Sequence, residues 1–153
     1  MPRFNVYNRM AAIKPLRDLA TYIQQSGIER SLIELIQMRV SQLNGCGYCL
    51  DMHSKDARAA GETEQRLYLL QVWREAPCYT PRERAALAWA EAVTLLDPLH
   101  GVPEAVYEQV RAEFSADDLI DLNMAVILIN SWNRIAIPSH ADVGSYKVGA
   151  HAS

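Results

Sequence analysis

Three side chains able to do redox chemistry lie within eight consecutive residues of the sequence. Two residues separate Cys46 from Cys49, and His53 follows four residues after Cys49. On a helix these spacings place the three side chains on one face, with the two sulfur atoms close enough to bond. A neighbouring imidazole can accept a thiol proton, and the resulting thiolate is the attacking species in peroxide reduction and disulfide exchange. The motif therefore predicts an activated dithiol.

The local sequence also places the first cysteine where negative charge is stabilised. Asn44-Gly45 interrupts the preceding helical pattern, so the next helix is expected to take up at Cys46. The unpaired amide groups of a first helical turn, together with the helix dipole, favour a thiolate over a thiol. Taken alone, this position favours Cys46 as the attacking sulfur.

Other uses of the cysteine pair stay open at this point. Buried cysteines can be inert packing residues. Cys46, Cys49 and His53 could also be three zinc ligands, although the sequence has no second CxxC and no HxxxH to supply a paired fourth ligand. The single residues that could complete such a site are Cys78, His100, His140 and His151. Haem attachment is excluded at the level of the motif, because Leu50 rather than His follows Cys49.

Composition limits the classes of function. The chain has 153 residues, half of them hydrophobic and 22% charged, which is typical of a globular domain. A net charge of −3 gives no basic footprint for nucleic acid or anionic lipid. The first residues lack the apolar segment of a signal peptide, and the most apolar stretch, residues 124–129, is too short to span a bilayer. We therefore expect a cytoplasmic protein without a membrane or nucleic-acid partner.

That location bears on the cysteines. The cytosol keeps ordinary thiols reduced, so three cysteines there do not form a structural disulfide framework. A close pair then indicates redox chemistry or metal binding. Cys78 stands alone in an expected loop and is interpreted as an incidental thiol. Two interpretations remain for Tyr48, which lies between the paired cysteines: control of access to the sulfur atoms, or packing alone.

Helical periodicity and capping residues cover nearly the whole chain, and no run shows sustained period-two alternation. These patterns predict an all-α fold of six or seven helices in one compact domain spanning residues 1–153. The expected helices are residues 11–25, 29–43, 46–60, 63–73, 80–96, 103–114 and 117–137. We expect Pro98 and Pro138 to end the last two long helices, which leaves a core of about 11–137 and a poorly ordered tail at 139–153. Excess apolar surface on several helices predicts a homo-oligomer.

A fourth residue connects this motif with a known family. Glu34 lies twelve residues before Cys46, and the combination of Glu34, the CxxC pair and His53 resembles the carboxymuconolactone decarboxylase-like superfamily, in particular its alkylhydroperoxidase (AhpD-like) branch. The resemblance runs over residues 31–60, with further similarity at 80–96 and 131–134. It implies an all-helical, oligomeric fold. Gly47 and Tyr48 stand between the cysteines, where related proteins can carry an additional His.

The resemblance also implies roles. Cys49 is then the attacking thiol, Cys46 the resolving thiol, and Glu34 with His53 a proton relay to Cys49. The implied activity is antioxidant: reduction of an organic hydroperoxide, with the Cys46–Cys49 disulfide reduced afterwards by an external thiol, in relatives a lipoyl-type donor. No metal and no further cofactor are expected. Without the resemblance, Glu34 reads as part of a solvated polar face.

Two alternatives are retained. A general thiol–disulfide oxidoreductase would use the same dithiol and react little with peroxides. A non-catalytic helical oligomer would use it for redox sensing or for zinc.

Overall fold

Seven α-helices build the chain, which is described for residues 2–150 by a computed structural model. The helices are α1 (Met10–Gln24), α2 (Arg30–Asn44), α3 (Gly47–Ala59), α4 (Glu64–Leu69), α5 (Pro81–Thr94), α6 (Glu104–Glu113) and α7 (Ala116–Ser139). Two 3₁₀-helices, η1 (Val6–Arg9) and η2 (Leu70–Val72), complete the structure, and residues 2–150 contain no β-strand. The predicted all-α fold is confirmed. The helix expected at 63–73 is divided between α4 and η2.

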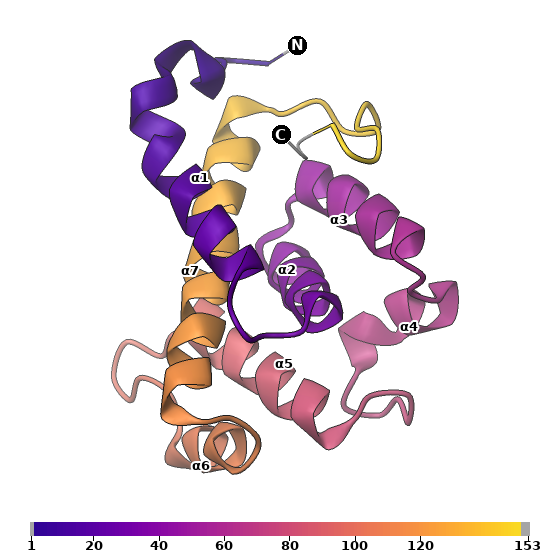
Figure 1. Cartoon of the computed structure of the whole chain (residues 1–153), viewed down its shortest axis with the longest axis vertical. Helices are drawn as coiled ribbons and strands as arrows, with labels where there is room; N and C mark the ends of the chain where they lie inside the picture. Colours follow the sequence, from indigo (N-terminus) through magenta and orange to yellow (C-terminus); the bar gives the residue numbers. More distant parts are fainter. Residues whose placement is uncertain (1, 151–153) are drawn as a thin grey trace.

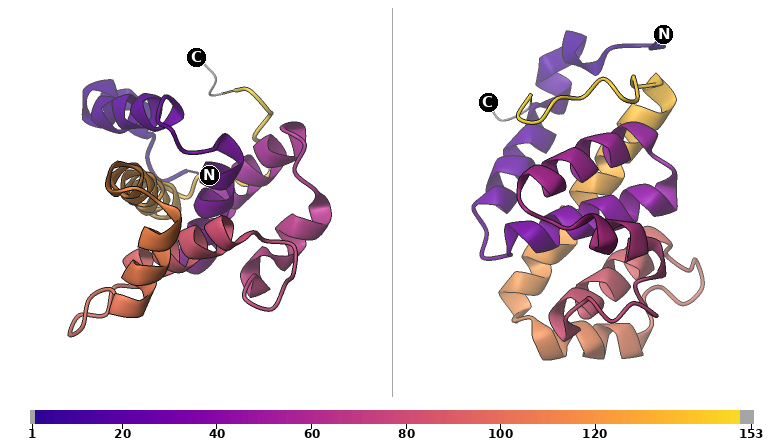
Figure 2. Two further views of the ribbon diagram at one scale, coloured as in Figure 1. Left: turned by 60° about the horizontal axis from the view of Figure 1, so that its bottom comes forward. Right: turned by 90° about the vertical axis from the view of Figure 1, so that its right-hand side faces the viewer.

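α2 lies at the centre, where it packs against α3, α5 and α7 (Figures 1 and 2). Its side chains at helical spacing, Leu32, Ile36 and Val40, are buried, as the periodicity predicts. α1 packs along α7, and α6 packs against α5. One apolar cluster joins α1, α2, α5 and α7 and includes both Cys46 and Cys49, so the redox motif is anchored in the core. Within the described residues, no helix is long and apolar enough to span a membrane.

The capping residues fix where two helices begin. Thr80 accepts a hydrogen bond from the Glu83 amide, and the Glu83 carboxylate accepts one from the Thr80 amide, so α5 starts with a complete capping box. Ser115 caps α7 in the same way through the Asp118 amide. The expected ends are less accurate. α5 ends at Thr94, before Pro98 is reached.

The prediction that Pro138 stops the last helix is wrong. α7 includes Pro138, ends at Ser139 and is capped by His140 in the left-handed conformation (φ 55°). Pro138 is exposed and lies in the last turn, where the carbonyl that loses its partner can be hydrated. The structural cost of the proline is therefore small at this position.

The tail also differs from its prediction. Residues 141–150, called the C-terminal strap below, fold back over α3 instead of lying free (Figure 1). Tyr146 within this strap is buried. Residues 151–153, and with them His151, lie outside the described part of the chain.

Candidate functional site

Cys46 caps the N-terminus of α3. Gly45, at a positive φ of 71°, turns the chain out of α2, and the Cys46 amide donates to the Ser41 carbonyl at 2.9 Å. Cys46 then has extended backbone, and its sulfur accepts a hydrogen bond from the Cys49 amide at 3.3 Å. The sulfur atoms of Cys46 and Cys49 form a disulfide. The helix thus begins one residue later than predicted, with Cys46 as its cap rather than its first residue.

His53 and Glu34 meet across two helices. The Nδ1 atom of His53, on α3, lies 3.0 Å from Oε2 of Glu34, on α2. Both side chains are mostly shielded, with 9% of the His53 side chain and 14% of the Glu34 side chain exposed. Glu34 therefore does not lie on a solvated polar face. A carboxylate accepts hydrogen bonds, so Nδ1 of His53 is the donor in this contact and Nε2 is the ring nitrogen that Glu34 does not engage.

Spacing relates this pair to the sulfur atoms. His53 follows Cys49 by four residues within α3, so the two side chains are neighbours on one helix face. Both side chains are buried. The structure thus brings all four predicted site residues, Cys46, Cys49, His53 and Glu34, to one region between α2 and α3.

A polar network missed by sequence reasoning holds the turn before Cys46. The Asn44 amide group donates to Asn130 at 3.0 Å and to Asn133 at 2.9 Å, and Asn133 donates to the Ser41 hydroxyl at 3.1 Å. Asn133 and Ser41 are fully buried. This network ties the end of α2 to α7 and so holds the backbone before Cys46 in place. In the sequence, the sign of this network is a polar amide side chain within the otherwise apolar pattern of the last helix.

A cavity of about 380 Å³ opens beside the disulfide. Its lining residues are Gly45, Cys46, Gly47, Tyr48, Ala136, Ile137, His140, Ala141 and Val143. Cys46 lines this cavity and Cys49 does not. Burial raises the pKa of the Tyr48 phenol above its usual 10.0, so Tyr48 is a neutral wall at physiological pH rather than a proton acceptor.

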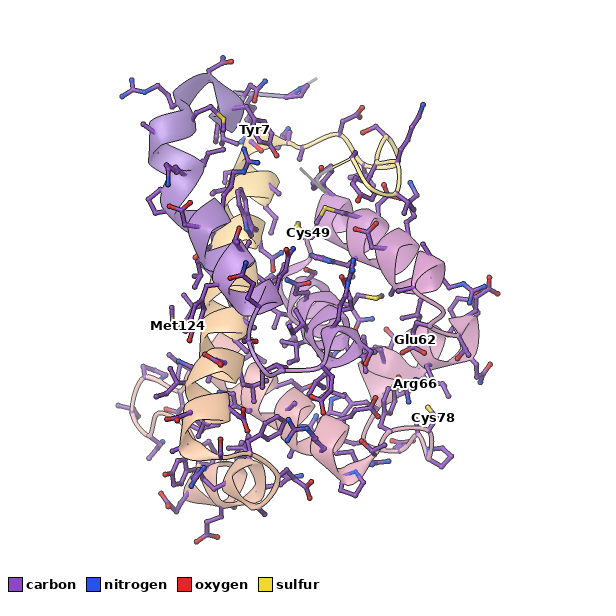
Figure 3. All side chains as sticks on the ribbon, viewed as in Figure 1. Tyr7, Cys49, Glu62, Arg66, Cys78 and Met124 are labelled. Atoms are coloured by element: carbon purple, nitrogen blue, oxygen red, sulfur yellow. A yellow bond between two sulfur atoms is a disulfide. The ribbon has the colours of Figure 1, made fainter. Side chains whose placement is uncertain are left out.

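The remaining candidate ligands and thiols are elsewhere. Cys78 is a free thiol that is well separated from Cys49 (Figure 3). The backbone carbonyl of Cys78 accepts a hydrogen bond from Arg66. His100 pairs with Asp97 at 3.2 Å in an exposed loop. In the part of the chain described here, no three His, Cys, Asp or Glu side chains are grouped so as to hold a metal ion.

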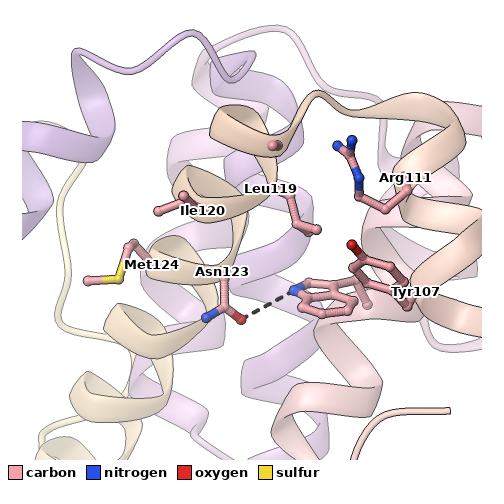
Figure 4. A pocket seen from close by; sticks show the side chains of 8 residues that line it. Tyr107, Arg111, Leu119, Ile120, Asn123 and Met124 are labelled. Atoms are coloured by element: carbon pink, nitrogen blue, oxygen red, sulfur yellow. Dashed lines mark hydrogen bonds between the residues drawn. The ribbon is translucent and has the colours of Figure 1, made fainter. Parts of the chain in front are cut away.

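A second cavity of similar size lies between α6 and α7 (Figure 4). Its walls include Tyr107, Arg111 and Met124, and the Trp89 indole donates to Asn123 at 3.3 Å on one side. None of the described residues that line it is a cysteine or a histidine.

Comparison with known proteins places the chain among relatives. Residues 10–92 match the model of the Carboxymuconolactone decarboxylase family. The uncharacterized protein YdfG of Bacillus subtilis is 47% identical over 125 residues, which cover 82% of this chain and 84% of YdfG. The alkyl hydroperoxide reductase AhpD of Rhodopseudomonas palustris is 37% identical over 65 residues, a local match to 37% of this chain and 36% of AhpD.

A solved structure extends the likeness to the whole fold. ATU0492 from Agrobacterium tumefaciens, a protein of unknown function suggested to be an AhpD antioxidant defence protein, superposes with a TM-score of 0.89. The two are 39% identical, and the match covers 95% of this chain and all of ATU0492. The expected resemblance is therefore confirmed by sequence and by structure: the chain belongs to the carboxymuconolactone decarboxylase family, and its fold is AhpD-like.

Proposed function

We propose that the chain is a thiol-dependent peroxidase that reduces organic hydroperoxides with the Cys46–Cys49 dithiol. The observation that carries this proposal is a buried CxxC disulfide at the start of α3, followed one helical turn later by His53, which is hydrogen-bonded to Glu34 of α2 at 3.0 Å. Glu34 fixes the ring tautomer, so the basic Nε2 nitrogen of His53 is available to a thiol one helical turn away. Membership of a family that includes alkyl hydroperoxide reductases supports the same activity.

In the first step, His53 takes the proton of the Cys49 thiol. The Cys49 thiolate attacks the terminal oxygen of the hydroperoxide, the O–O bond breaks, and an alkoxide leaves. His53 returns the proton to the alkoxide, which becomes the alcohol. Cys49 is left as a sulfenic acid, oxidised by two electrons, and the peroxide has been reduced by the same two electrons.

In the second step, the Cys46 thiol attacks the sulfenic sulfur. The disulfide forms, and the hydroxyl group leaves with the Cys46 proton as water. An external dithiol then reduces the disulfide and becomes a disulfide itself. Over the cycle one hydroperoxide and one dithiol give one alcohol, one water and one disulfide. A lipoyl-type dithiol, the donor of related proteins, is the proposed reductant.

Access supports this division between the two sulfur atoms. Cys46 lines the cavity and Cys49 does not, so an incoming reductant reaches Cys46 first. Attack on Cys46 releases Cys49 as the leaving thiolate, beside His53, where the next cycle needs it. Helix capping stabilises the charge on Cys46 during its own attack on the sulfenic acid. Cys46 and Cys49 thus each serve a distinct step of one catalytic cycle.

The assembly and the location are part of the proposal. Several large apolar side chains are exposed, among them Ile120 and Ile127 on α7, and we propose that a second copy of the chain covers this face. Light scattering of the purified protein tests this. The cycle needs a supply of reduced dithiol, so we propose the cytoplasm as its location.

The test uses pre-reduced protein and one equivalent of cumene hydroperoxide. We expect one equivalent of alcohol and loss of two free thiols in wild type, and the same result in Cys78→Ser. Cys49→Ser should consume no peroxide. Equal consumption by Cys49→Ser contradicts the proposal. Faster reaction with a model disulfide than with the hydroperoxide favours a general thiol–disulfide oxidoreductase instead.

A further inference from the structure

The C-terminal strap, residues 141–150, is fastened to α3 by side chains on one helix face. Lys55 donates to the Tyr146 carbonyl at 2.9 Å and to the Gly144 carbonyl at 3.4 Å, while pairing with Asp51. The Gly144 amide donates to Asp51 at 3.2 Å. The Asp51–Lys55 pair, called the latch below, therefore holds the middle of the strap through both of its charged groups.

A second fastening point is the Tyr146 ring. Its hydroxyl donates to both carboxylate oxygens of Asp56 at 2.9 Å. Burial, together with the Asp56 carboxylate, raises the pKa of Tyr146 to about 12. The phenol stays protonated at physiological pH and remains a donor to Asp56. The strap is consequently a fixed part of the surface rather than a free tail.

This strap forms one wall of the cavity beside the disulfide. Ala141 and Val143 come from the strap, Ala136 and Ile137 from α7, and Cys46 from the base of the cavity. A Cβ atom built on Gly47 would lie only 3.2 Å from a methyl group of Val143. The strap thus approaches the CxxC turn about as closely as the glycine between the cysteines permits.

The chemistry of the walls is mostly apolar. None of the described residues that line the cavity is a lysine, an arginine or a carboxylate, and the polar side chains among them other than Cys46 are Tyr48 and His140. A volume of about 380 Å³ is at the small end of ligand cavities and accommodates a compact organic group. A dithiol with a compact apolar body can bury that body there as it approaches Cys46.

We propose that the strap is the wall that selects the reductant: through Val143 it admits compact apolar groups to Cys46 and excludes bulky ones. The identity of the selected reductant, a compact apolar dithiol, rests on the proposed function. Control of access to Cys46 does not, and it is measured without any peroxide.

Access is tested on a Cys49→Ser/Cys78→Ser background, in which Cys46 is the sole thiol. The rate of alkylation by iodoacetamide is compared with that of a bulky fluorescent maleimide, by mass spectrometry. Val143→Ala should raise the maleimide-to-iodoacetamide rate ratio about tenfold, the effect of a small change in a tight apolar site. Lys55→Met, which removes the latch, should raise it too.

Val148→Ala is the matched control, because Val148 is exposed on the same strap and does not line the cavity. It should leave the ratio at the wild-type value. An unchanged ratio in Val143→Ala overturns the proposal. An equal rise in Val143→Ala and Val148→Ala also overturns it, since that pattern reports general loosening rather than a wall.

Reductant choice is tested with the cysteines restored. With cumene hydroperoxide as the oxidant, wild-type turnover should be faster with dihydrolipoamide than with a dihydrolipoyl dithiol linked to a bulky fluorophore, and Val143→Ala should lower that preference about tenfold by opening the cavity. Equal rates with the two dithiols in wild type overturn the reductant assignment. Absence of turnover with every peroxide overturns the proposed function instead, and leaves the alkylation rates to decide the role of the strap.

Discussion

Glu34 and Glu91 are carboxylates that are buried to a similar extent but have different hydrogen-bond partners. Their side chains are 14% and 11% exposed, and both contact α2 or belong to it. Within the described residues Glu34 has one hydrogen-bond partner, the titratable ring of His53. Glu91, on α5, accepts from Arg39 at 2.6 Å, from the Trp73 indole at 2.8 Å and from Arg74 at 2.5 Å.

The comparison separates the carboxylate that we propose to take part in catalysis from a structural one. Arginine keeps its proton in proteins, so Glu91 is held as a fixed anion between permanent cations. Burial opposes its ionisation, but the hydrogen bonds from Trp73, Arg39 and Arg74 outweigh burial and lower the pKa of Glu91 below 4.5. Glu34 is paired with an imidazole, the side chain that commonly serves as a proton acceptor in catalysis, and its proposed role is to orient that ring. Buried carboxylates are thus distinguished by whether their partner titrates.

Replacing the proton acceptor should give the largest effect. His53→Gln keeps a donor for Glu34 but removes the basic nitrogen, and we expect peroxide turnover to fall about 10²- to 10⁴-fold, the usual contribution of a general base. The melting temperature should stay near that of wild type. Stopped-flow peroxide consumption measures the rate. His100→Gln, in an exposed loop, is the control, and an equal loss there would show that the effect is not local.

Replacing the structural carboxylate should affect stability instead. Glu91→Gln leaves the Arg39 guanidinium, whose side chain is 13% exposed, without its counterion. We expect a loss of about 3 kcal/mol in the free energy of unfolding, and a fall on the order of 10 °C in melting temperature. Turnover per folded molecule should be unchanged. Calorimetry checks the first point, with exposed Glu108→Gln as control, and a selective loss of turnover would contradict the assignment.

Removing the charge that orients His53 should have an intermediate effect on rate. Glu34→Gln keeps a hydrogen-bonding side chain but no longer enforces the tautomer with a basic Nε2. We expect turnover to fall about tenfold to a hundredfold, less than in His53→Gln, because the base itself remains. The pH–rate profile should change shape as well as height. A wild-type profile in Glu34→Gln would assign the residue to packing.

The smallest effect concerns acid stability. Because the folded-state pKa of Glu91 lies below its unfolded value of about 4.5, its stabilisation is full above that value and is lost as pH falls through the folded pKa. The melting temperatures of wild type and Glu91→Gln should therefore converge as the pH falls below about 4.5. A constant difference across this range would show that Glu91 does not carry the charge assigned to it.

Local patterns predicted what depends on neighbouring residues. Thr80 with Glu83 and Ser115 marked helix starts, and the spacing of Cys46, Cys49 and His53 placed them on one helix. Local patterns did not predict the contacts between distant segments. Glu34 meets His53 only because α2 packs against α3, a choice that its own helical neighbours do not specify.

The strap shows the same limit more sharply. Gly144 and the terminal position of the segment suggested disorder, yet Lys55, Asp51 and Asp56 on α3 hold it in place. Those three residues read as an ordinary charged helix face in the sequence. Their function as a latch becomes visible only when the partner segment is known.

The central claim is that Cys49 attacks the peroxide, and one trapping measurement tests it most directly. Reduced Cys46→Ser and Cys49→Ser proteins are each pulsed with cumene hydroperoxide in the presence of dimedone, which captures sulfenic acids, and the adducts are located by mass spectrometry. We predict an adduct on Cys49 in Cys46→Ser, where no resolving thiol remains, and none in Cys49→Ser. An adduct on Cys46 in Cys49→Ser, with none on Cys49 in Cys46→Ser, would contradict the account.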